Sequence, residues 1–363
     1  MTKKAIYSIV GGLVIIAIIL IAIFSGSSTS SGKETVTIGV TLPLSGDVAF
    51  LGIPEQNAVK MAQEDFMQNK KFDYKIVIED DAYDAKKVAT NMQKFVSIDN
   101  ADVVLTFGSL AANVVAPVAE ENKVVFVAAS ASDTSVADGY YGFDFTTTPQ
   151  KEAEKMAEEL KKRGYTKVAL IRENGEASEA IMKATRNELM KNSIEIVAED
   201  VFNTGDTDFK TGLLKIKESD AQISLIFTVP PSLELLAKQY KDLNIEIPMT
   251  AIESFGLTEE KGLFEGQWYI DANYPSEEFF AKYKAKYGED PSPYAADVYS
   301  ILEMVVSSYE QSDQKISHED LVEKLMSIQN FDTYFGKVSV NDKGVFETPA
   351  TLKKIENGEA VLI

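Results

Sequence analysis

Few of the side chains that commonly do chemistry in proteins occur in this sequence. It contains no cysteine and only one histidine, His318. The lack of cysteine excludes disulfides, thiol nucleophiles and sulfur-ligated zinc, and one histidine cannot build a multi-histidine metal site. His318 lies at the start of a predicted helix and has no candidate catalytic or metal-binding partners near it in the sequence. This is typical of a solvated first-turn residue. The catalytic and nucleotide-binding patterns GxSxG, HExxH, GxxxxGK and GxGxxG are absent as well. We therefore expect no enzyme activity, no cofactor and no metal site.

The densest group of acidic residues is the best candidate for a metal site in this sequence. It consists of Glu79, Asp80, Asp81 and Asp84. Carboxylates in this number can bind calcium, but the alternating DxDxDG spacing of a calcium loop is not present. The four residues fall where a predicted strand ends and a predicted helix begins. We interpret Asp84 as the N-cap of that helix and the other three as its solvated neighbours.

Small hydroxyl residues are concentrated in three loops that each follow a predicted strand. These loops are 42–46, 107–109 and 128–132. In an open α/β sheet, ligands bind beyond the carboxyl ends of the strands, where helix N-termini direct backbone N–H groups outward. Ser109, Ser130 and Ser132 are therefore predicted to converge on one acceptor, such as a carboxylate. Ser109 taken alone is also explained as a simple helix N-cap.

The elements that would hold these loops alternate regularly between strand and helix. Short runs rich in β-branched residues alternate with helical patterns up to residue 128, which indicates a parallel sheet flanked by helices. The same alternation begins again after Pro149 and continues to about Met249. The sequence thus predicts two α/β units of comparable size. A mainly helical region over 277–329 and short strands over 338–363 follow them.

An apolar run without a charged residue occupies residues 5–24, directly after Lys3 and Lys4. A helix of ~20 residues rises about 30 Å, enough to cross the hydrocarbon core of a bilayer. The flanking lysines predict that the rest of the chain lies outside the cytoplasm. A cleaved signal peptide is the alternative, although its apolar run is usually shorter, about 7–15 residues. We expect an anchor or signal segment over 1–24 and a polar linker over 25–33.

The part of the chain beyond the apolar run is strongly acidic. The sequence holds 36 basic and 56 acidic residues, a formal net charge of −20. Such a surface repels phosphate backbones, which argues against nucleic acid as a partner. It also disfavours lying flat on anionic lipid. Together with the missing cysteines and the single histidine, composition therefore removes most enzyme classes and disfavours nucleic acid.

Several stretches together resemble the type I periplasmic binding proteins, specifically the leucine/isoleucine/valine-binding group that serves ABC importers. They are, in chain order over 35–344, IGVTLPLSGDVAFLG, EDDAYDAKK, FGSLAANVVAPVAEENKVVFVAASASD, YGFDFTTTP, YTKVALI and FFAKYKAKYGEDPSPYAADVYSIL. The resemblance implies an α/β fold of two Rossmann-like lobes, joined by three crossover strands with a ligand cleft between them. It places residues 34–148 and 271–333 in the first lobe, and residues 149–270 and 334–363 in the second.

The resemblance also implies roles for individual residues. Ser109, Ser130 and Ser132 fall where the family holds the α-carboxylate of an amino acid. Glu253 falls where an acid meets the α-ammonium group, and an exposed loop glutamate is the alternative interpretation of this residue.

Three ligand-site positions depart from the family. Leu51 stands in place of an aromatic residue, Ala177 in place of a tyrosine of the second lobe, and Lys151 in place of an acid. These departures predict a roomier site in which ammonium recognition is weakened and carboxylate recognition is retained.

The function that the resemblance implies is that of an extracytoplasmic solute-binding receptor of an ABC importer. It would bind an amino acid or a related small carboxylate and be tethered to the cell membrane by its N-terminal helix. Its partners would be the small solute, the ABC permease subunits and the membrane, and not nucleic acid. The alternative is a ligand-binding sensor ectodomain of the same fold.

Overall fold

The computed structural model describes residues 32–272, 274–292 and 294–363. The predicted anchor or signal segment, 1–24, lies outside the described residues. Within the described ranges, no helix is long and apolar enough to cross a lipid bilayer. Two groups of elements, each with hydrophobic cores of its own, make up the part from Thr35 onward. We call them the first lobe and the second lobe.

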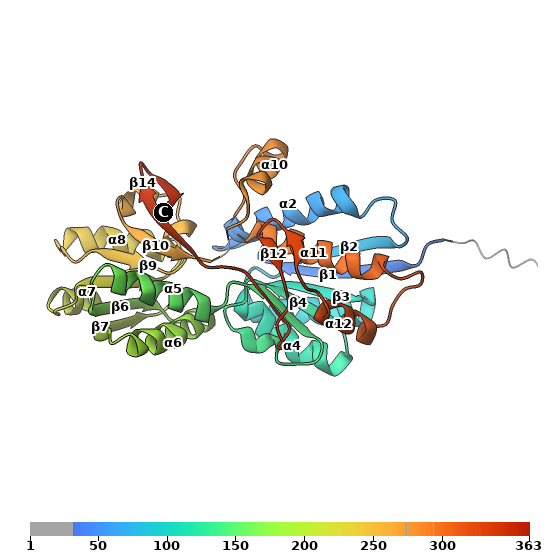
Figure 1. Cartoon of the computed structure of the whole chain (residues 1–363), viewed down its shortest axis with the longest axis horizontal. Coiled ribbons are helices and arrows are strands. Elements are labelled where there is room, and N and C mark those ends of the chain that lie inside the picture. Colours follow the sequence, from blue (N-terminus) through green and yellow to red (C-terminus); the bar gives the residue numbers. More distant parts are fainter. Residues whose placement is uncertain (1–31, 273, 293) are drawn as a thin grey trace, which may run out of the picture. The chain divides into compact units, whose positions relative to one another are not determined.

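The first lobe is built on a six-stranded parallel sheet (Figure 1). In spatial order its strands are β13 (Val345–Glu347), β5 (Gly142–Thr146), β4 (Val125–Ala129), β3 (Val103–Phe107), β1 (Thr35–Leu42) and β2 (Asp73–Asp80). Its helices are α2 (Ala49–Phe66), α3 (Ala85–Lys94), α4 (Gly108–Asn122), α10 (Glu277–Tyr287), α11 (Ala295–Glu310) and α12 (His318–Met326). A π-helical turn (Phe95–Asp99), a short 3₁₀ turn (Thr134–Ala137) and a hairpin of β11 (Phe331–Thr333) and β12 (Gly336–Val338) complete it.

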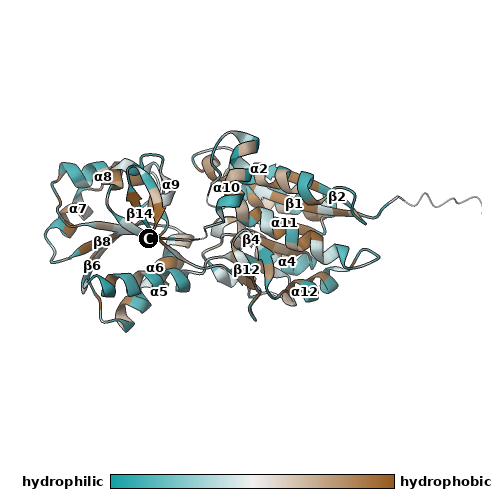
Figure 2. Cartoon of the chain, turned by 45° about the horizontal axis from the view of Figure 1, so that its top comes forward, coloured by the Kyte–Doolittle hydropathy of each residue, from teal (hydrophilic) through white to brown (hydrophobic). Residues whose placement is uncertain are grey.

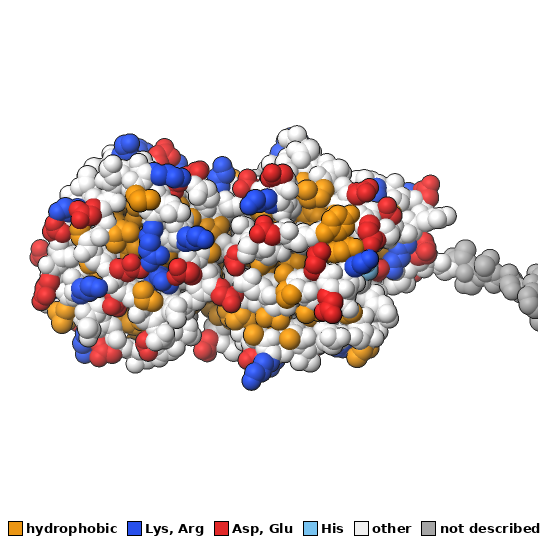
Figure 3. All heavy atoms as spheres, turned by 90° about the horizontal axis from the view of Figure 1, so that it is seen from below, with side chains coloured by type: hydrophobic (Ala, Val, Ile, Leu, Met, Phe, Trp, Pro, Cys, Tyr) orange, Lys and Arg blue, Asp and Glu red, His pale blue; other side chains and the backbone are white. Residues whose placement is uncertain are grey.

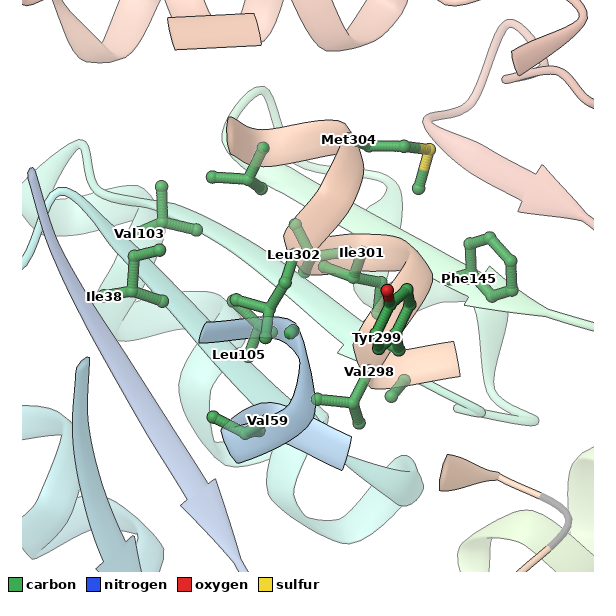
Figure 4. Close-up of a cluster of buried hydrophobic side chains, with 14 of the residues drawn as sticks. Ile38, Val59, Val103, Leu105, Phe145, Val298, Tyr299, Ile301, Leu302 and Met304 are labelled. Carbon is green, nitrogen blue, oxygen red and sulfur yellow. The ribbon is translucent and has the colours of Figure 1, made fainter. Parts of the chain in front are cut away.

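Helices cover both faces of this sheet because successive strand residues point to opposite sides. Val36, Ile38 and Val40 of β1 pack in one core with residues of α2 and α11. Figure 4 shows this core, with Ile38 of β1 and Val59 of α2 among its labelled side chains. On the opposite face, the ring of Phe95 packs so closely on Gly39 that a Cβ there would lie 2.7 Å from the ring. The first lobe is therefore a doubly wound α/β layer structure.

The second lobe repeats the arrangement on a smaller sheet. Four parallel strands lie in the order β7 (Glu195–Phe202), β6 (Lys167–Glu173), β8 (Ile223–Phe227) and β9 (Met249–Ala251). An antiparallel sheet adds β10 (Trp268–Asp271), β14 (Thr351–Glu356) and β15 (Glu359–Leu362). One face carries α5 (Pro149–Lys162) and α6 (Glu176–Lys191), and the other carries α7 (Lys210–Lys217) and α8 (Ser232–Asp242). Two short turns, α9 (Ser254–Leu257) and a 3₁₀ turn (Lys261–Phe264), link these elements.

The chain passes between the lobes three times. It leaves β5 for α5 near Thr147, leaves β10 for α10 after Asp271, and leaves β13 for β14 near Thr348. The Thr147 and Thr348 hydroxyl groups lie 2.8 Å apart, so the first and third passages run side by side. Thr351 donates a hydrogen bond to the Asp271 carbonyl oxygen at 3.4 Å, which joins the third passage to the second.

The predicted α/β class with parallel sheets flanked by helices is confirmed. The structure differs from the prediction at one lobe boundary, near the C-terminus. The sequence interpretation assigned all of 334–363 to the second lobe. Instead, β13 pairs with β5 in the first-lobe sheet, and Phe346 packs in the first-lobe core. The return to the second lobe falls near Thr348, because β13 extends the six-stranded sheet at its edge before the chain crosses.

The distribution of polar residues over this framework follows burial. Figure 2 shows hydrophobic residues gathered on the strands and on the inner sides of the helices. On the face drawn in Figure 3, acidic and basic side chains are interspersed. This face therefore carries charges of both signs, although the chain as a whole is negative.

Candidate functional site

The two lobes meet through hydrogen bonds between side chains. Asn113 on α4 of the first lobe donates to Glu176 at the start of α6 at 2.8 Å. Tyr294, which packs in the first-lobe core, donates through its hydroxyl to Glu253 of the second lobe at 3.2 Å. Both contacts lie beyond the carboxyl ends of strands, where open α/β sheets bind ligands. The facing edges of the two lobes are therefore the candidate site.

Two cavities lie along these edges. The first cavity has a volume of about 550 Å³, and its lining includes Ser132 of the first lobe with Glu176 and Lys183 of the second. The second cavity has a volume of about 530 Å³, and its lining includes Leu51 of the first lobe and Leu257 of the second. Both volumes are in the range of small-molecule sites. Each cavity draws residues from both lobes, so a solute held there would touch both.

Ser109 lies in the first turn of α4, directly after β3. Helix α4 begins at Gly108, so Ser109 is inside the helix and is not its N-cap. The residue is buried, and its hydroxyl oxygen accepts a hydrogen bond from the Asp133 backbone N–H at 3.1 Å. This bond uses the oxygen and leaves the hydroxyl proton for another acceptor. Ser109 thus lies at the N-terminus of a 15-residue helix, a position that favours an anion.

Ser130 and Ser132 differ in what their hydroxyl groups can do. Ser130 has a left-handed backbone, with φ of 55°, and its hydroxyl donates to the buried Asp297 of α11. Its proton is therefore already used within the first lobe. Ser132 is partly exposed and lines the first cavity. Of the three predicted hydroxyl donors, Ser132 lines the first cavity, whereas Ser109 is buried and lines neither of the two cavities.

Glu253 stands at the second-lobe edge, in a left-handed conformation with φ of 61° just after β9. It is not a fully exposed loop residue, because it is only partly accessible and its carboxyl accepts a hydrogen bond from Tyr294. Burial raises the pKa of this carboxyl to about 7, and the charge on Asp271 acts in the same direction, while the adjacent Glu152 carboxyl and the hydrogen bond from Tyr294 oppose the shift. Burial also raises the pKa of Glu152 well above its usual range, and the charge on Glu253 adds to the effect. Two carboxyl groups in contact cannot both ionise readily, so the pair holds a proton that a cation could replace.

Lys151 does not occupy the position that the sequence interpretation gave it. Its side chain is exposed on α5, whereas the next residue, Glu152, is fully buried and faces Glu253. Each step along a helix turns the side chain by about 100°, so neighbouring residues of α5 point in different directions. The expectation of weakened ammonium recognition therefore loses its basis. The helical periodicity of α5 could have predicted that Glu152 is buried. The buried face of this helix includes Pro149, Glu152, Ala153 and Met156.

The remaining predicted residues, Leu51 and Ala177, lie on helices at the lobe edges. Leu51 is buried in the first turn of α2 and lines the second cavity. Ala177 is partly buried in the first turn of α6, next to Glu176 of the first cavity. Gly52, beside Leu51, allows α2 to approach the loop after β1, because a Cβ there would lie 2.2 Å from the Pro43 carbonyl oxygen. Neither helix start carries a large aromatic side chain at these positions.

Sequence reasoning missed Tyr294 and Asn113, which make the contacts between the lobes. Tyr294 comes from the N-cap of α11 and pairs with a residue 41 positions away, and no local pattern encodes such a partner. Asn113 reads as an ordinary helical residue, yet it bridges Asp133 at 3.3 Å and Glu176. His318, by contrast, opens α12 as expected, with its ring nitrogen Nδ1 2.6 Å from the Lys123 carbonyl oxygen.

A protein-family model described as a periplasmic binding protein matches residues 35–360. Among individual proteins, the leucine-, isoleucine-, valine-, threonine- and alanine-binding protein of Pseudomonas aeruginosa is 21% identical over 345 residues, covering 89% of this chain and 90% of that protein. A leucine-binding protein of Thermotoga maritima is similar in structure, with a TM-score of 0.83 at 19% identity over 90% of this chain and 97% of that one. An ABC transporter solute-binding protein from R. palustris, solved with benzoate, gives a TM-score of 0.81 at 16% identity over 91% of this chain and 96% of that one.

Proposed function

The chain belongs to the periplasmic binding protein family, and we propose that it is an extracytoplasmic receptor that delivers an amino acid or a related small carboxylate to ABC permease subunits. In this role it binds and releases a solute and does no chemistry on it. The relatives named above are a protein that binds leucine, isoleucine, valine, threonine and alanine, a leucine-binding protein and a protein solved with benzoate, which supports a small carboxylate as the ligand class.

The observation that carries this proposal is the burial of both Glu152 carboxyl oxygens without a hydrogen-bond partner in the described part of the chain, beside the Glu253 carboxyl at the second-lobe edge. A buried pair of acids is costly unless a cation or a shared proton compensates it. The α-ammonium group of an amino acid supplies that cation. On the first-lobe side, Ser109 and the N-terminus of α4 offer donors suited to the α-carboxylate. A zwitterion therefore matches the two edges better than a simple anion does.

Solute binding would draw the two edges together around the ligand. The three passages near Thr147, Asp271 and Thr348 are the places where the backbone can turn, because the lobes have separate hydrophobic cores. Closure would remove water from both sides of the solute and strengthen its charge-assisted hydrogen bonds. Small-angle scattering with and without saturating solute measures the change, and an unchanged radius of gyration would argue against it.

We further propose that residues 5–24 stay attached and tether the receptor to the membrane. The support is the length of the uncharged run and the two lysines before it. N-terminal sequencing of the mature protein distinguishes the two cases. A start near Thr29 would mean that the segment is a cleaved signal peptide.

The ligand class is tested with the Glu152→Gln variant. Wild-type protein and the variant are titrated with L-leucine and with benzoate by calorimetry. Loss of one carboxylate should weaken leucine by about 1.5–3 kcal/mol and leave benzoate much less affected. Lys151→Ala is the matched control, because this neighbour is exposed and should leave both affinities unchanged. Equal effects of Glu152→Gln on both ligands would contradict ammonium binding at the pair.

Mass spectrometry of gently purified protein provides a second test that does not depend on a chosen panel. A co-purifying amino acid or small carboxylate is the expected result. A sugar, a metal complex or a nucleoside in its place would overturn the assigned ligand class while leaving the binding-protein fold intact.

A further inference from the structure

The loop between β2 and α3 carries an aromatic side chain, Tyr83, toward the candidate site. We propose that Tyr83 is a specificity-determining residue, whose ring limits the size of the solute and whose hydroxyl donates a hydrogen bond to the solute's carboxylate. This inference rests on the proposed function, because it concerns the same site.

The acids that the sequence analysis singled out hold this loop in place. Asp80 accepts hydrogen bonds from the backbone N–H groups of Leu44 at 2.9 Å and Ala82 at 2.9 Å. Asp81 accepts from the Tyr83 N–H at 2.8 Å and from the Thr41 hydroxyl at 2.9 Å. Two of these bonds connect the loop to β1 and the segment after it, and the other two hold the backbone of the loop itself in one conformation. The acid cluster thus fixes a backbone shape, which a solvated run of charges would not do.

That shape is an unusual one for residues other than glycine. Ala82 and Tyr83 both have left-handed backbones, with φ of 47° and 55°. Such conformations cost about 1 kcal/mol or more each and persist only where the surroundings impose them. The hydrogen bonds to Asp80 and Asp81 impose them here, and Asp84 then caps α3 by accepting from the Lys86 and Lys87 N–H groups. The result is a rigid support for the side chain of Tyr83.

The Tyr83 ring lies against the first residue of α4. A Cβ added at Gly108 would be 3.3 Å from the Tyr83 hydroxyl oxygen and 3.5 Å from the ring carbon Cε2. Gly108 directly precedes Ser109, the buried donor described above. The phenol is therefore beside the helix N-terminus to which the solute carboxylate is assigned.

The second lobe approaches the same phenol. Burial raises the pKa of Tyr83 to about 12, and the negative charges of Glu176, Asp81 and Glu173 contribute. Glu176 and Glu173 belong to the second lobe, so Tyr83 lies where the edges of the two lobes meet. At neutral pH the phenol stays protonated and can donate a hydrogen bond. A neighbouring carboxylate of the solute is a suitable acceptor for it.

Two variants separate the two parts of the role. Tyr83→Phe keeps the ring and removes the hydroxyl, and we expect roughly tenfold weaker binding of L-leucine by calorimetry. Tyr83→Ala removes the ring, and we expect the affinity for L-phenylalanine relative to L-leucine to rise by about tenfold. Tyr140→Phe and Tyr140→Ala are matched controls, since Tyr140 is exposed. If the affinity for L-phenylalanine relative to L-leucine is unchanged in Tyr83→Ala, the ring does not limit the size of the solute. If leucine binding is unchanged in Tyr83→Phe, the hydroxyl does not donate to the solute.

A second experiment tests the location of Tyr83 without any ligand. The chain has no cysteine, so Tyr83→Cys carries a unique thiol whose rate of maleimide labelling can be followed. We expect labelling at least about tenfold slower than in Asp313→Cys, whose parent side chain is 97% exposed. Equal labelling rates would show that position 83 is open to solvent and would overturn the inference. If the wild-type protein binds neither amino acid, the proposed ligand class fails, and the labelling rate alone decides where Tyr83 lies.

Discussion

The buried carboxyl group of Glu152 lies beside that of Glu253 where helix α5 meets the loop after β9, and neither Glu152 oxygen has a hydrogen-bond partner among the described residues. Glu152 is fully buried and Glu253 is only partly accessible, and Tyr294 of the first lobe donates a hydrogen bond to Glu253. Because two adjacent carboxylates repel each other, the ligand-free pair retains a proton near neutral pH. Under the proposed function, an ammonium group that enters between them would replace this proton, and binding of an amino acid would be linked to release of a proton.

We expect the affinity for L-leucine to increase as the pH rises from about 5.5 to 8. The pair must lose its proton before it can accept an ammonium group, and the raised pKa of Glu253, about 7, places that loss in this range. The amino group of leucine stays protonated throughout. Calorimetry in two buffers with different ionisation enthalpies measures the proton release directly.

The control for this prediction is benzoate, which has a carboxylate and no ammonium group. Its affinity should not increase over the same pH range. The Glu253→Gln variant should lose most of the pH dependence for leucine as well. Leucine binding that is independent of pH, or that weakens as the pH rises, would contradict the proton exchange.

The same pair should affect the stability of the ligand-free protein. The folded-state pKa of Glu253 is raised, so its contribution to stability is complete below its unfolded value and is lost as the pH rises through about 7. Glu253→Gln removes this loss. The variant should therefore gain about 1–3 kcal/mol relative to wild type between pH 5 and pH 8, measured by urea unfolding. A constant difference between the two proteins at both pH values would exclude the effect.

The two serines of the first-lobe edge should respond differently to mutation. Ser109→Ala removes a hydroxyl donor, so affinity for a carboxylate should fall by roughly 1–3 kcal/mol, and loss of the acceptor for the Asp133 N–H should also lower the free energy of unfolding by about 1 kcal/mol. Ser130→Ala removes a donor to the buried Asp297, so it should lower the free energy of unfolding by about 1–3 kcal/mol. Titration and urea unfolding of both variants make the comparison. A Ser130→Ala variant that is fully stable but cannot bind would reverse the assignment.

Much of the fold could be predicted because it is encoded locally. The first of the predicted β-branched strands forms β1, since its residues are buried on both sides of a parallel sheet. The site was harder because its geometry depends on contacts between distant segments. Ser130 meets Asp297, which is 167 residues away, and a left-handed backbone turns its hydroxyl toward that partner. Alignment to a family motif selected Lys151, whereas the helical period of α5 places Glu152 on the inner face.

Gly52 offers a test of how α2 is positioned. Replacing a glycine within a helix by alanine usually stabilises by about 0.5–1 kcal/mol. At Gly52, however, the new Cβ would lie 2.2 Å from the Pro43 carbonyl oxygen, and the backbone would have to move. We expect Gly52→Ala to destabilise by about 1–3 kcal/mol or more and to weaken solute binding, because Leu51 would shift with the helix. Gly262→Ala is the control, since no atom lies within 4 Å of its added Cβ, and it should unfold like wild type.

The ion pair between Lys353 and Asp271, which lies where the chain crosses between the lobes, should contribute strongly to the stability of the folded protein. The Lys353 ammonium group lies 2.6 Å from Asp271 and 3.7 Å from the centre of the Tyr274 ring, and both charged side chains are buried. Removing one partner of a buried pair leaves the other charge uncompensated, which costs about 3–5 kcal/mol. Lys353→Met should therefore reduce the free energy of unfolding by this amount at neutral pH. The exposed neighbour provides the control, because Lys354→Met breaks only a surface pair and should cost about 0–1 kcal/mol.

The pH dependence of the Lys353→Met variant separates lost charge compensation from lost packing. Burial raises the pKa of Asp271, and Lys353 opposes that shift. Without the lysine the carboxyl should take up a proton more readily, so the deficit relative to wild type should shrink as the pH falls. Asp271→Asn in the Lys353→Met background removes the uncompensated charge and should recover part of the stability at pH 7. If the deficit is the same at every pH and the second substitution recovers nothing, the contribution of Lys353 is packing against Tyr274 and not its charge.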